Sequence, residues 1–145
     1  MKIQIKFRWS DKVIFEGEYN SMKECVVDAV LRGVVLSDAV LSDAVLSGVP
    51  KIKNIHQEVY NAASHPNALD MSTWHRCETT HCRAGWVIAL AGEAGAAMES
   101  CMGTATAAAL IYLKSDPSLE RMPNFYTDNE TAMADMKRLA ELESA

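Results

Sequence analysis

The sequence predicts an α+β protein with an N-terminal β-hairpin and helix, a short pentapeptide-like connector and a C-terminal helical group. Three observations predict this fold class: apolar and polar residues alternate at the start of the chain, a five-residue repeat follows, and apolar residues at helical spacing dominate after Pro50. We therefore expect a hairpin and helix over residues 1–33, a connector over 34–50 and a helical domain over 51–145.

The composition and length are those of a globular protein that can form a hydrophobic core without disulfide bonds or a structural metal ion. The 145 residues are 49% hydrophobic and 23% charged, and 14 basic against 19 acidic side chains give a net charge of −5. This charge provides no attraction to nucleic acid or to an anionic membrane.

The stretch 84–113 is rich in small residues, but Glu93 and Glu99 interrupt it, so we expect no membrane span. Because the N-terminus lacks the apolar run of a signal peptide, we expect a cytoplasmic protein with reduced cysteines.

The first part of the chain alternates as in a β-hairpin. Four apolar side chains share one face of the first strand: Ile3, Ile5, Phe7 and Trp9. A three-residue loop at 10–12 would place Phe7 opposite Phe15, which makes the apolar faces coincide. The same register places Lys6 opposite Glu16, so that the outer charges match.

A helix should follow the hairpin. Ser21 and Glu24 have the spacing of a capping box, and Gly33 is a natural terminator. Between them, apolar residues at helical spacing supply a buried stripe: Val26, Val27, Val30 and Leu31.

The connector contains three successive repeats, VVLSD, AVLSD and AVLSG, at residues 34–38, 39–43 and 44–48. Five residues advance by about 500° on a helix and change face on a strand, so neither element presents the repeated leucine on one side. The repeats resemble the pentapeptide-repeat family, whose pattern is Ala-(Asp/Asn)-Leu-x-x, although valines replace the polar second residue. The resemblance implies a square β-solenoid coil. Three repeats are too few to stack, so we expect an extended or single-coil connector that packs its leucines against the hairpin or helix.

Helices account for the rest of the chain. Apolar periodicity and capping residues predict them over 52–63, from 79 or 80 to 91, over 93–102, over 104–113 and from 127 onward. Glycine and proline mark several of their ends, at Pro66, Gly92, Gly103 and Pro117.

Residues 74–86 concentrate chemically active side chains, with two of the four histidines, two of the four cysteines and two of the three tryptophans. Four of these side chains are candidate zinc ligands, because thiolate and imidazole together complete a tetrahedron: His75, Cys77, His81 and Cys82. Adjacent residues on a helix diverge by about 100°, which opposes a shared metal ion for the last two.

Two other interpretations of this segment stay open. One is a reactive cysteine: Cys82 falls in the first turn of a predicted helix, where the helix dipole lowers a thiol pKa. His75 or His81 would then act as the base. The other is structural, with Cys77 and Cys82 as small buried residues, or as a pair that bridges on oxidation, and with Trp86 in the core.

The same segment is the best candidate for a ligand pocket. Arginine and aromatic rings together suit nucleotide-like anions. The candidate ligand-binding residues are Trp74, His75, Arg76, His81, Arg83 and Trp86. The alternative is a core with a charged rim.

A motif in this segment carries a second resemblance. The spacing Cys77-x4-Cys82-x-Ala84-Gly85-Trp86 is similar to a helix-start motif in uncharacterised proteins of bacteria and their phages. Together with the repeat block, it resembles small prophage-encoded pentapeptide-repeat proteins. This resemblance implies a phage accessory protein that acts in the host cytoplasm, and it assigns no catalytic residue.

The chain lacks the motifs of common enzyme classes: it has no phosphate-binding glycine loop, no H-E-x-x-H, no G-x-S-x-G and no dinucleotide fingerprint. With the resemblance to phage proteins, this predicts a non-enzymatic binding or inhibitor protein. Such a protein would oppose host defence by binding a host protein or by sequestering a small, anionic, nucleotide-like signal. We expect no nucleic-acid or membrane partner and no cofactor, with zinc as the alternative. Two other functions stay open: a structural phage component that forms a homo-oligomer, and a zinc- or cysteine-dependent enzyme centred on His75, Cys77, His81 and Cys82.

Overall fold

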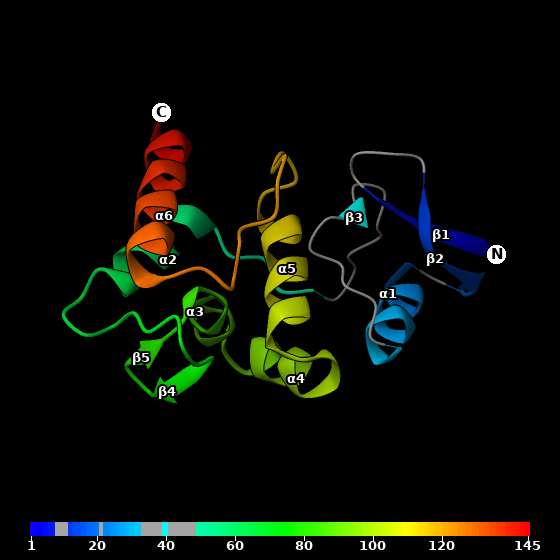
Figure 1. Cartoon of the computed structure of the whole chain (residues 1–145), viewed down its shortest axis with the longest axis horizontal. Helices are drawn as coiled ribbons and strands as arrows, with labels where there is room; N and C mark the ends of the chain where they lie inside the picture. Colours follow the sequence, from blue (N-terminus) through cyan, green and yellow to red (C-terminus); the bar gives the residue numbers. More distant parts are fainter. Residues whose placement is uncertain (8–11, 21, 33–38, 41–48) are drawn as a thin grey trace.

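A computed structural model describes residues 1–7, 12–20, 22–32, 39–40 and 49–145. Over these residues the predicted α+β fold is confirmed. A small antiparallel sheet and one helix lie at one end of the molecule, and a group of helices forms the rest (Figure 1). No helix in this part of the chain is long and apolar enough to cross a bilayer.

Three strands form the N-terminal sheet in the order β2-β1-β3, with antiparallel neighbours: β1 (Lys2–Phe7), β2 (Val13–Glu18) and β3 (Ala39–Val40). Ile5 lies opposite Phe15, and Lys6 lies opposite Val13, with an irregularity between Ile5 and Lys6. The predicted register, with Phe7 opposite Phe15, is therefore wrong by two residues.

From Lys2 to Ile5 the observed register keeps the predicted faces, because a shift of two residues leaves each side chain on the same side of the sheet. Beyond the irregularity, Val13 lies opposite Lys6 and is exposed. Ile5 is fully buried, as predicted. The predicted pairing of Lys6 with Glu16 is replaced by two other contacts. Lys2 Nζ lies 3.1 Å from Glu16 Oε2, and Gln4 Nε2 donates to the same carboxylate oxygen at 2.7 Å.

The five-residue repeats lie outside the described residues, apart from Ala39 and Val40. These two residues form β3 and pair with Phe7 and Lys6 of β1. The pentapeptide-like connector therefore stays a prediction.

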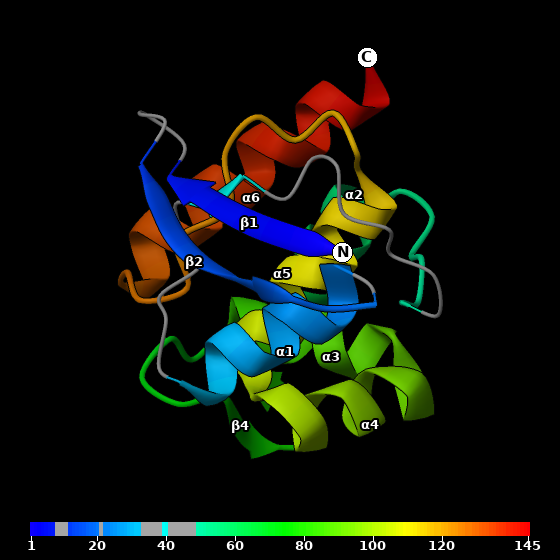
Figure 2. The same ribbon diagram turned by 90° about the vertical axis from the view of Figure 1, so that its right-hand side faces the viewer.

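Helix α1 (Met22–Leu31) contacts both strands of the hairpin and also α4, and it lies below the strands in Figure 2. Before its N-terminus, Asn20 N donates to Glu24 Oε2 at 2.9 Å. Ser21, the predicted cap, lies outside the described residues, so the capping box stays a prediction. Tyr19 Oη donates to Asp28 Oδ2, which ties the end of the hairpin to the helix. Its buried residues include Cys25, Val26 and Ala29.

Over residues 49–145, five helices form the remaining core: α2 (Ile55–Ala63), α3 (Arg83–Leu90), α4 (Gly92–Met102), α5 (Thr104–Ser115) and α6 (Asn129–Ser144). Helix α5 lies in the middle of the molecule (Figure 1) and packs on α3 and α4, while α2 packs on α6 and α3. Ala107 and Ala108 are fully buried, and their small side chains let α5 approach its neighbours closely.

The start of α3 differs from the prediction. The sequence predicted a helix from Thr79 or Thr80, but the helix begins only at Arg83. The two threonines lie in the turn and second strand of a short antiparallel hairpin, which consists of β4 (His75–Cys77) and β5 (Thr80–His81).

Tertiary hydrogen bonds explain this difference. His81 N donates to Ala68 O and Asp70 N donates to His81 O, both at 3.1 Å, so the backbone of β5 is paired with a preceding loop. Cys82 then caps the helix, because its Sγ accepts a hydrogen bond from Gly85 N at 3.3 Å. A helix that included His81 would lose both loop bonds.

Candidate functional site

The structure distributes the predicted ligand-binding residues among several places. Three of them gather where the β4-β5 hairpin meets α3: His75, His81 and Trp86. The Trp74 ring packs edge-on against Tyr126, with 5.6 Å between ring centroids. Arg83 contacts α5 and α6 instead. Arg76 is exposed and pairs with Asp70 at 3.0 Å.

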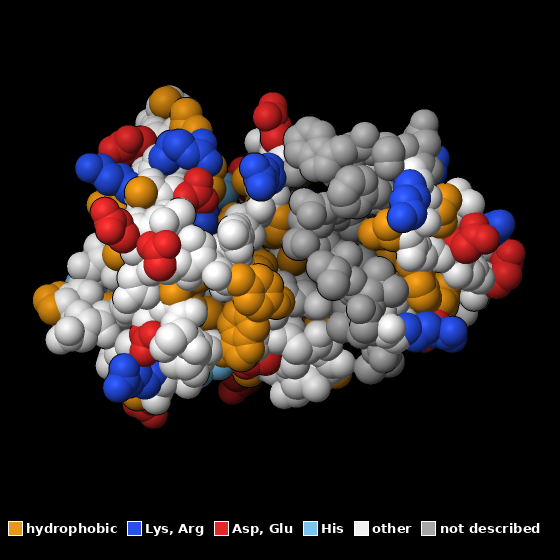
Figure 3. All heavy atoms as spheres, in the orientation of Figure 1, with side chains coloured by type: hydrophobic (Ala, Val, Ile, Leu, Met, Phe, Trp, Pro, Cys, Tyr) orange, Lys and Arg blue, Asp and Glu red, His pale blue; other side chains and the backbone are white. Residues whose placement is uncertain are grey.

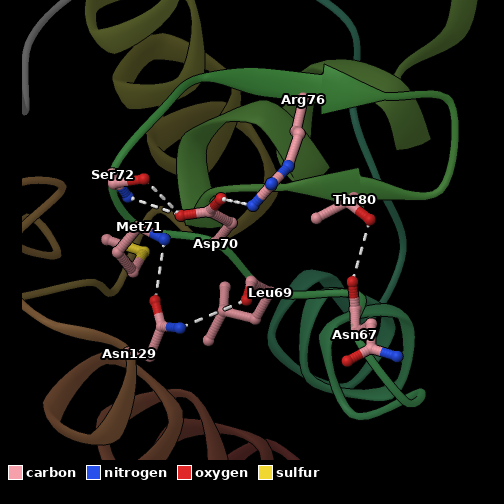
Figure 4. A network of polar contacts seen from close by, with 8 residues as sticks. All are labelled: Asn67, Leu69, Asp70, Met71, Ser72, Arg76, Thr80 and Asn129. Carbon is pink, nitrogen blue, oxygen red and sulfur yellow. Dashed lines mark hydrogen bonds and ion pairs between the residues drawn. The ribbon is translucent and has the colours of Figure 1, made fainter.

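Arg76 belongs to a polar network that fixes the loop before the hairpin (Figure 4). Its guanidinium donates to Asp70, which lies in that loop. Asn129, at the start of α6, bridges two loop residues: its Oδ1 accepts from Met71 N at 2.7 Å, and its Nδ2 donates to Leu69 O at 3.3 Å. Because these groups bond to one another, the network holds the hairpin and its loop against α6.

His75 and His81 form a hydrogen-bonded pair that extends to Glu99. His75 Nδ1 lies 2.9 Å from His81 Nδ1, and His75 Nε2 lies 2.7 Å from Glu99 Oε1. His81 Nε2 lies 3.1 Å from Glu78 O, and a carbonyl only accepts, so this nitrogen of His81 carries a proton. Burial lowers the pKa of His81, which keeps its ring neutral. Its Nδ1 therefore accepts, and His75 Nδ1 donates.

This pair connects the carboxylate of Glu99 with the buried ring of His81, and each nitrogen of the two rings has a partner. Thr104 Oγ1 donates to the same oxygen of Glu99 at 2.6 Å. The Trp86 ring packs edge-on against His81, with 4.6 Å between ring centroids. These contacts tie the β4-β5 hairpin to Glu99 of α4.

The four predicted zinc ligands are not brought together. The two histidines bond to each other through their Nδ1 atoms, Cys77 is exposed beside Thr79, and Cys82 is buried as the cap of α3. Among the residues that the structure describes, no three His, Cys, Asp or Glu side chains are grouped so that they could hold a metal ion. The zinc site stays a prediction without support from this geometry.

The two cysteines of the segment lie in different environments, one buried and one exposed. Cys82 is buried, and burial raises the pKa of its thiol, although hydrogen bonds such as that from Gly85 N act against this. The burial of Cys82 agrees with the structural interpretation and gives the interpretation of Cys82 as a reactive thiol no support. Cys77, for which burial was considered, is exposed. Hydrogen bonds with Thr79 and Thr80 lower its pKa to about 7.

We expect iodoacetamide to alkylate Cys77 with a half-maximal rate near pH 7, because about half of this thiol is ionised there. Peptide mass mapping after a short exposure measures the modification of each cysteine. Cys82 is the internal control: it should stay unmodified in the native protein and react in urea, because it is buried. A Cys77 profile centred near pH 8.5, as for an ordinary thiol, would contradict the lowered pKa.

Arg83 is a buried cation with one unpaired nitrogen. Its side chain is 1% exposed. Its Nε donates to Tyr112 Oη at 3.1 Å, and its Nη1 donates to Asp135 Oδ2 at 2.6 Å. Its Nη2 has no hydrogen-bond partner in the described part of the chain. Native proteins pair such groups, because a buried charged N–H without an acceptor is costly.

A hollow of about 290 Å³ borders this guanidinium, between α6 and the segment that precedes it. We call it the Arg83 hollow. Its charged lining residues are three arginines and one aspartate: Arg83, Arg121, Arg138 and Asp135. The hollow therefore has an excess of positive charge in a chain whose net charge is −5. The surface over α6 carries acidic and basic side chains side by side (Figure 3).

In comparisons with known proteins, the chain has no significant match to a family model, to a curated protein or to a solved structure. Its candidate sites are therefore derived from its own residues.

Sequence reasoning missed the partners of Arg83. Tyr112 and Asp135 lie 29 and 52 residues further along the chain, and no local motif connects them with Arg83. One feature of the sequence could have indicated that Asp135 has a basic partner. Asp135 stands between Ala132 and Met136 on the apolar face of the last helix, where a carboxylate needs a basic partner.

Proposed function

We propose that the protein is a non-enzymatic binding protein that holds a small anionic molecule in the Arg83 hollow. The observation that carries the proposal is the buried Nη2 of Arg83, which has no partner among the described residues and belongs to a side chain that lines the hollow. Leaving a buried donor unpaired costs about 1–3 kcal/mol, and an anionic oxygen in the hollow would pair it. Carboxylate and phosphate suit this role, because their oxygens match the N–H fork of a guanidinium.

The rest of the lining supports the same class of ligand. Arg121 and Arg138 add positive charge. Thr131 lines the hollow from the first turn of α6, where the helix dipole supplies a positive partial charge. Asp135 opposes this charge, but it engages Nη1 of Arg83 and leaves Nη2 for a ligand.

The resemblance to phage accessory proteins provides the biological setting that we propose. We favour sequestration of a small anionic signal of the host over binding of a host protein. A hollow of about 290 Å³ admits a phosphate or carboxylate group and a few neighbouring atoms, whereas a protein partner needs a broad surface.

Isothermal titration calorimetry with inorganic phosphate and with adenosine monophosphate tests this function. We expect the wild-type protein to bind at least one of these anions. Arg83→Met should weaken the binding at least tenfold, because it removes the guanidinium and keeps an apolar stem. Arg76→Met is the matched control, since it removes an exposed arginine that does not line the hollow, and it should leave the affinity unchanged.

Two results would overturn the proposal: no binding of either anion by the wild-type protein, or an equal loss of affinity in the Arg76 control. Circular dichroism shows whether Arg83→Met is folded. If it is not, Arg121→Met replaces it, because Arg121 lines the same hollow. An unchanged affinity in that variant would also contradict the site.

A zinc- or cysteine-dependent enzyme is the second candidate function, and one observation favours its cysteine form. Cys77 is exposed, and its pKa is lowered to about 7. Cys77→Ser separates the two functions. An enzyme that uses this thiol would lose turnover, whereas a binding protein would keep its affinity for anions.

A further inference from the structure

A second hollow, of about 460 Å³, adjoins the Arg83 hollow. We call it the His56 hollow. The two share three lining residues and so form one groove along α6: Arg121, Arg138 and Leu139. A ligand held at Arg83 can therefore extend toward His56.

His56, in the first turn of α2, has a buried nitrogen without a partner in the described part of the chain. Its side chain is 3% exposed, its Nε2 lies 2.9 Å from Asp116 Oδ2, and its Nδ1 is unpaired. Burial acts to raise the pKa of Asp116, but hydrogen bonds from Ser118 and His56 outweigh it and lower this pKa below its ordinary value. Asp116 is therefore an ionised acceptor, and His56 Nε2 donates to it.

When Nε2 carries the proton of the neutral His56 ring, Nδ1 has none and can only accept a hydrogen bond. The two unpaired nitrogens of the groove consequently need opposite partners. Arg83 Nη2 needs an acceptor, and His56 Nδ1 needs a donor.

The charge of the groove also changes, from an excess of basic side chains in the Arg83 hollow to an excess of acidic ones in the His56 hollow. Three acidic residues line the His56 hollow and are absent from the lining of the Arg83 hollow: Asp116, Glu120 and Glu143. They attract a cationic donor such as an ammonium group. Leu119 and Leu142 line the same hollow, and with the shared Leu139 they offer apolar surface to an aliphatic chain.

We infer that the ligand is an amphoteric small molecule, with a carboxylate or phosphate group at Arg83 and an amino group at His56, joined by a short aliphatic chain. This inference rests on the proposed anion site. The amino group donates to His56 Nδ1 and lies near the carboxylates of the His56 hollow. The anionic group pairs with Arg83 Nη2.

A series of ω-amino carboxylates of increasing chain length, each compared with the alkyl carboxylate of the same length, tests the inference by calorimetry at neutral pH. At the best length, the amino group should improve the dissociation constant at least tenfold. His56→Phe keeps a buried ring and should abolish this improvement. Glu143→Gln should reduce it, whereas the control Glu141→Gln, an exposed residue of α6 outside both linings, should not.

The outcomes separate the two proposals. If alkyl carboxylates bind and the amino group adds nothing at any length, the inference is overturned and the anion site stands. If neither series binds, or if Arg83→Met weakens neither, the inference is overturned, and the titrations with phosphate and adenosine monophosphate decide whether the anion site stands. Should His56→Phe not fold, Glu143→Gln decides: an unchanged effect of the amino group would overturn the inference.

Discussion

Replacing Gly85 with alanine is expected to lower the free energy of unfolding by about 3 kcal/mol. A Cβ atom at this position would lie only 2.1 Å from Trp74 O. It would also lie 3.0 Å from His81 Cβ and 3.2 Å from His75 Nδ1. The nearest of these atoms belongs to the backbone and cannot rotate away. Trp74 O also accepts a hydrogen bond from Cys82 N at 3.2 Å, so relief of the clash would separate the start of α3 from the hairpin.

Urea unfolding followed by circular dichroism measures this loss. Gly92→Ala is the matched control: apart from its chain neighbours and its own helix, no described atom lies within 4 Å of a Cβ at Gly92, but its φ is +64°, so we expect only a backbone cost of about 1 kcal/mol. A second readout is the hydrogen bond between His75 and His81, whose loss would change the imidazole signals in NMR spectra. Equal destabilisation in the two variants would contradict the close approach at Gly85.

The hairpin shows what an alternating sequence pattern can predict. Alternation determines which residues face the core, and Ile3 and Ile5 are buried as predicted. Alternation does not determine the register, because a shift of two residues keeps the same side chains on each face of the sheet. The pairing of Ile5 with Phe15 and the irregularity beside it depend on the turn, which the pattern does not specify.

Helix ends were predictable where a local signal marks them. Gly103 has a positive φ and separates α4 from α5 at the predicted position. The start of α3 has no such signal, because it depends on backbone bonds between His81 and the loop residues Ala68 and Asp70. Apolar spacing does not by itself imply burial at a helix end: Leu142, in the last turn of α6, is 62% exposed.

The candidate site was only partly predictable for the same reason. Neighbours in sequence were expected to share one pocket, but His81 ends the hairpin and Arg83 begins a helix. The Arg83 side chain therefore leaves the His75 cluster for α5 and α6. The arginine itself was identified from its charge. The residues that complete its hollow, over 121–139, follow no local motif, because the packing of α6 against the rest of the core brings them there.

Replacing Asp135 with alanine should destabilise the protein by about 2–3 kcal/mol, because the buried guanidinium of Arg83 loses its counter-charge. This loss is smaller than for a fully buried pair, since the Asp135 side chain is 33% exposed and solvent screens the interaction. Burial acts to raise the pKa of Asp135, but hydrogen bonds from Arg83 and Arg138 outweigh it and hold the pKa below its ordinary value. The stabilisation is therefore fully present above about pH 4 and is lost as the pH falls through the lowered pKa.

Urea unfolding across this pH range measures the effect, and the wild type and Asp135→Ala should converge in acid. Arg138→Gln is the matched control: it removes the exposed partner of the same carboxylate, at 2.7 Å, and should cost about 0.5 kcal/mol or less. Thermal unfolding with added phosphate then separates a structural role of Arg83 from a ligand-binding one. In Asp135→Ala, neither Nη atom of Arg83 keeps its protein acceptor, so phosphate should raise the Tm more than in the wild type. If neither phosphate nor adenosine monophosphate changes the Tm of either protein, Arg83 and Asp135 form a structural pair alone, and the anion site is overturned.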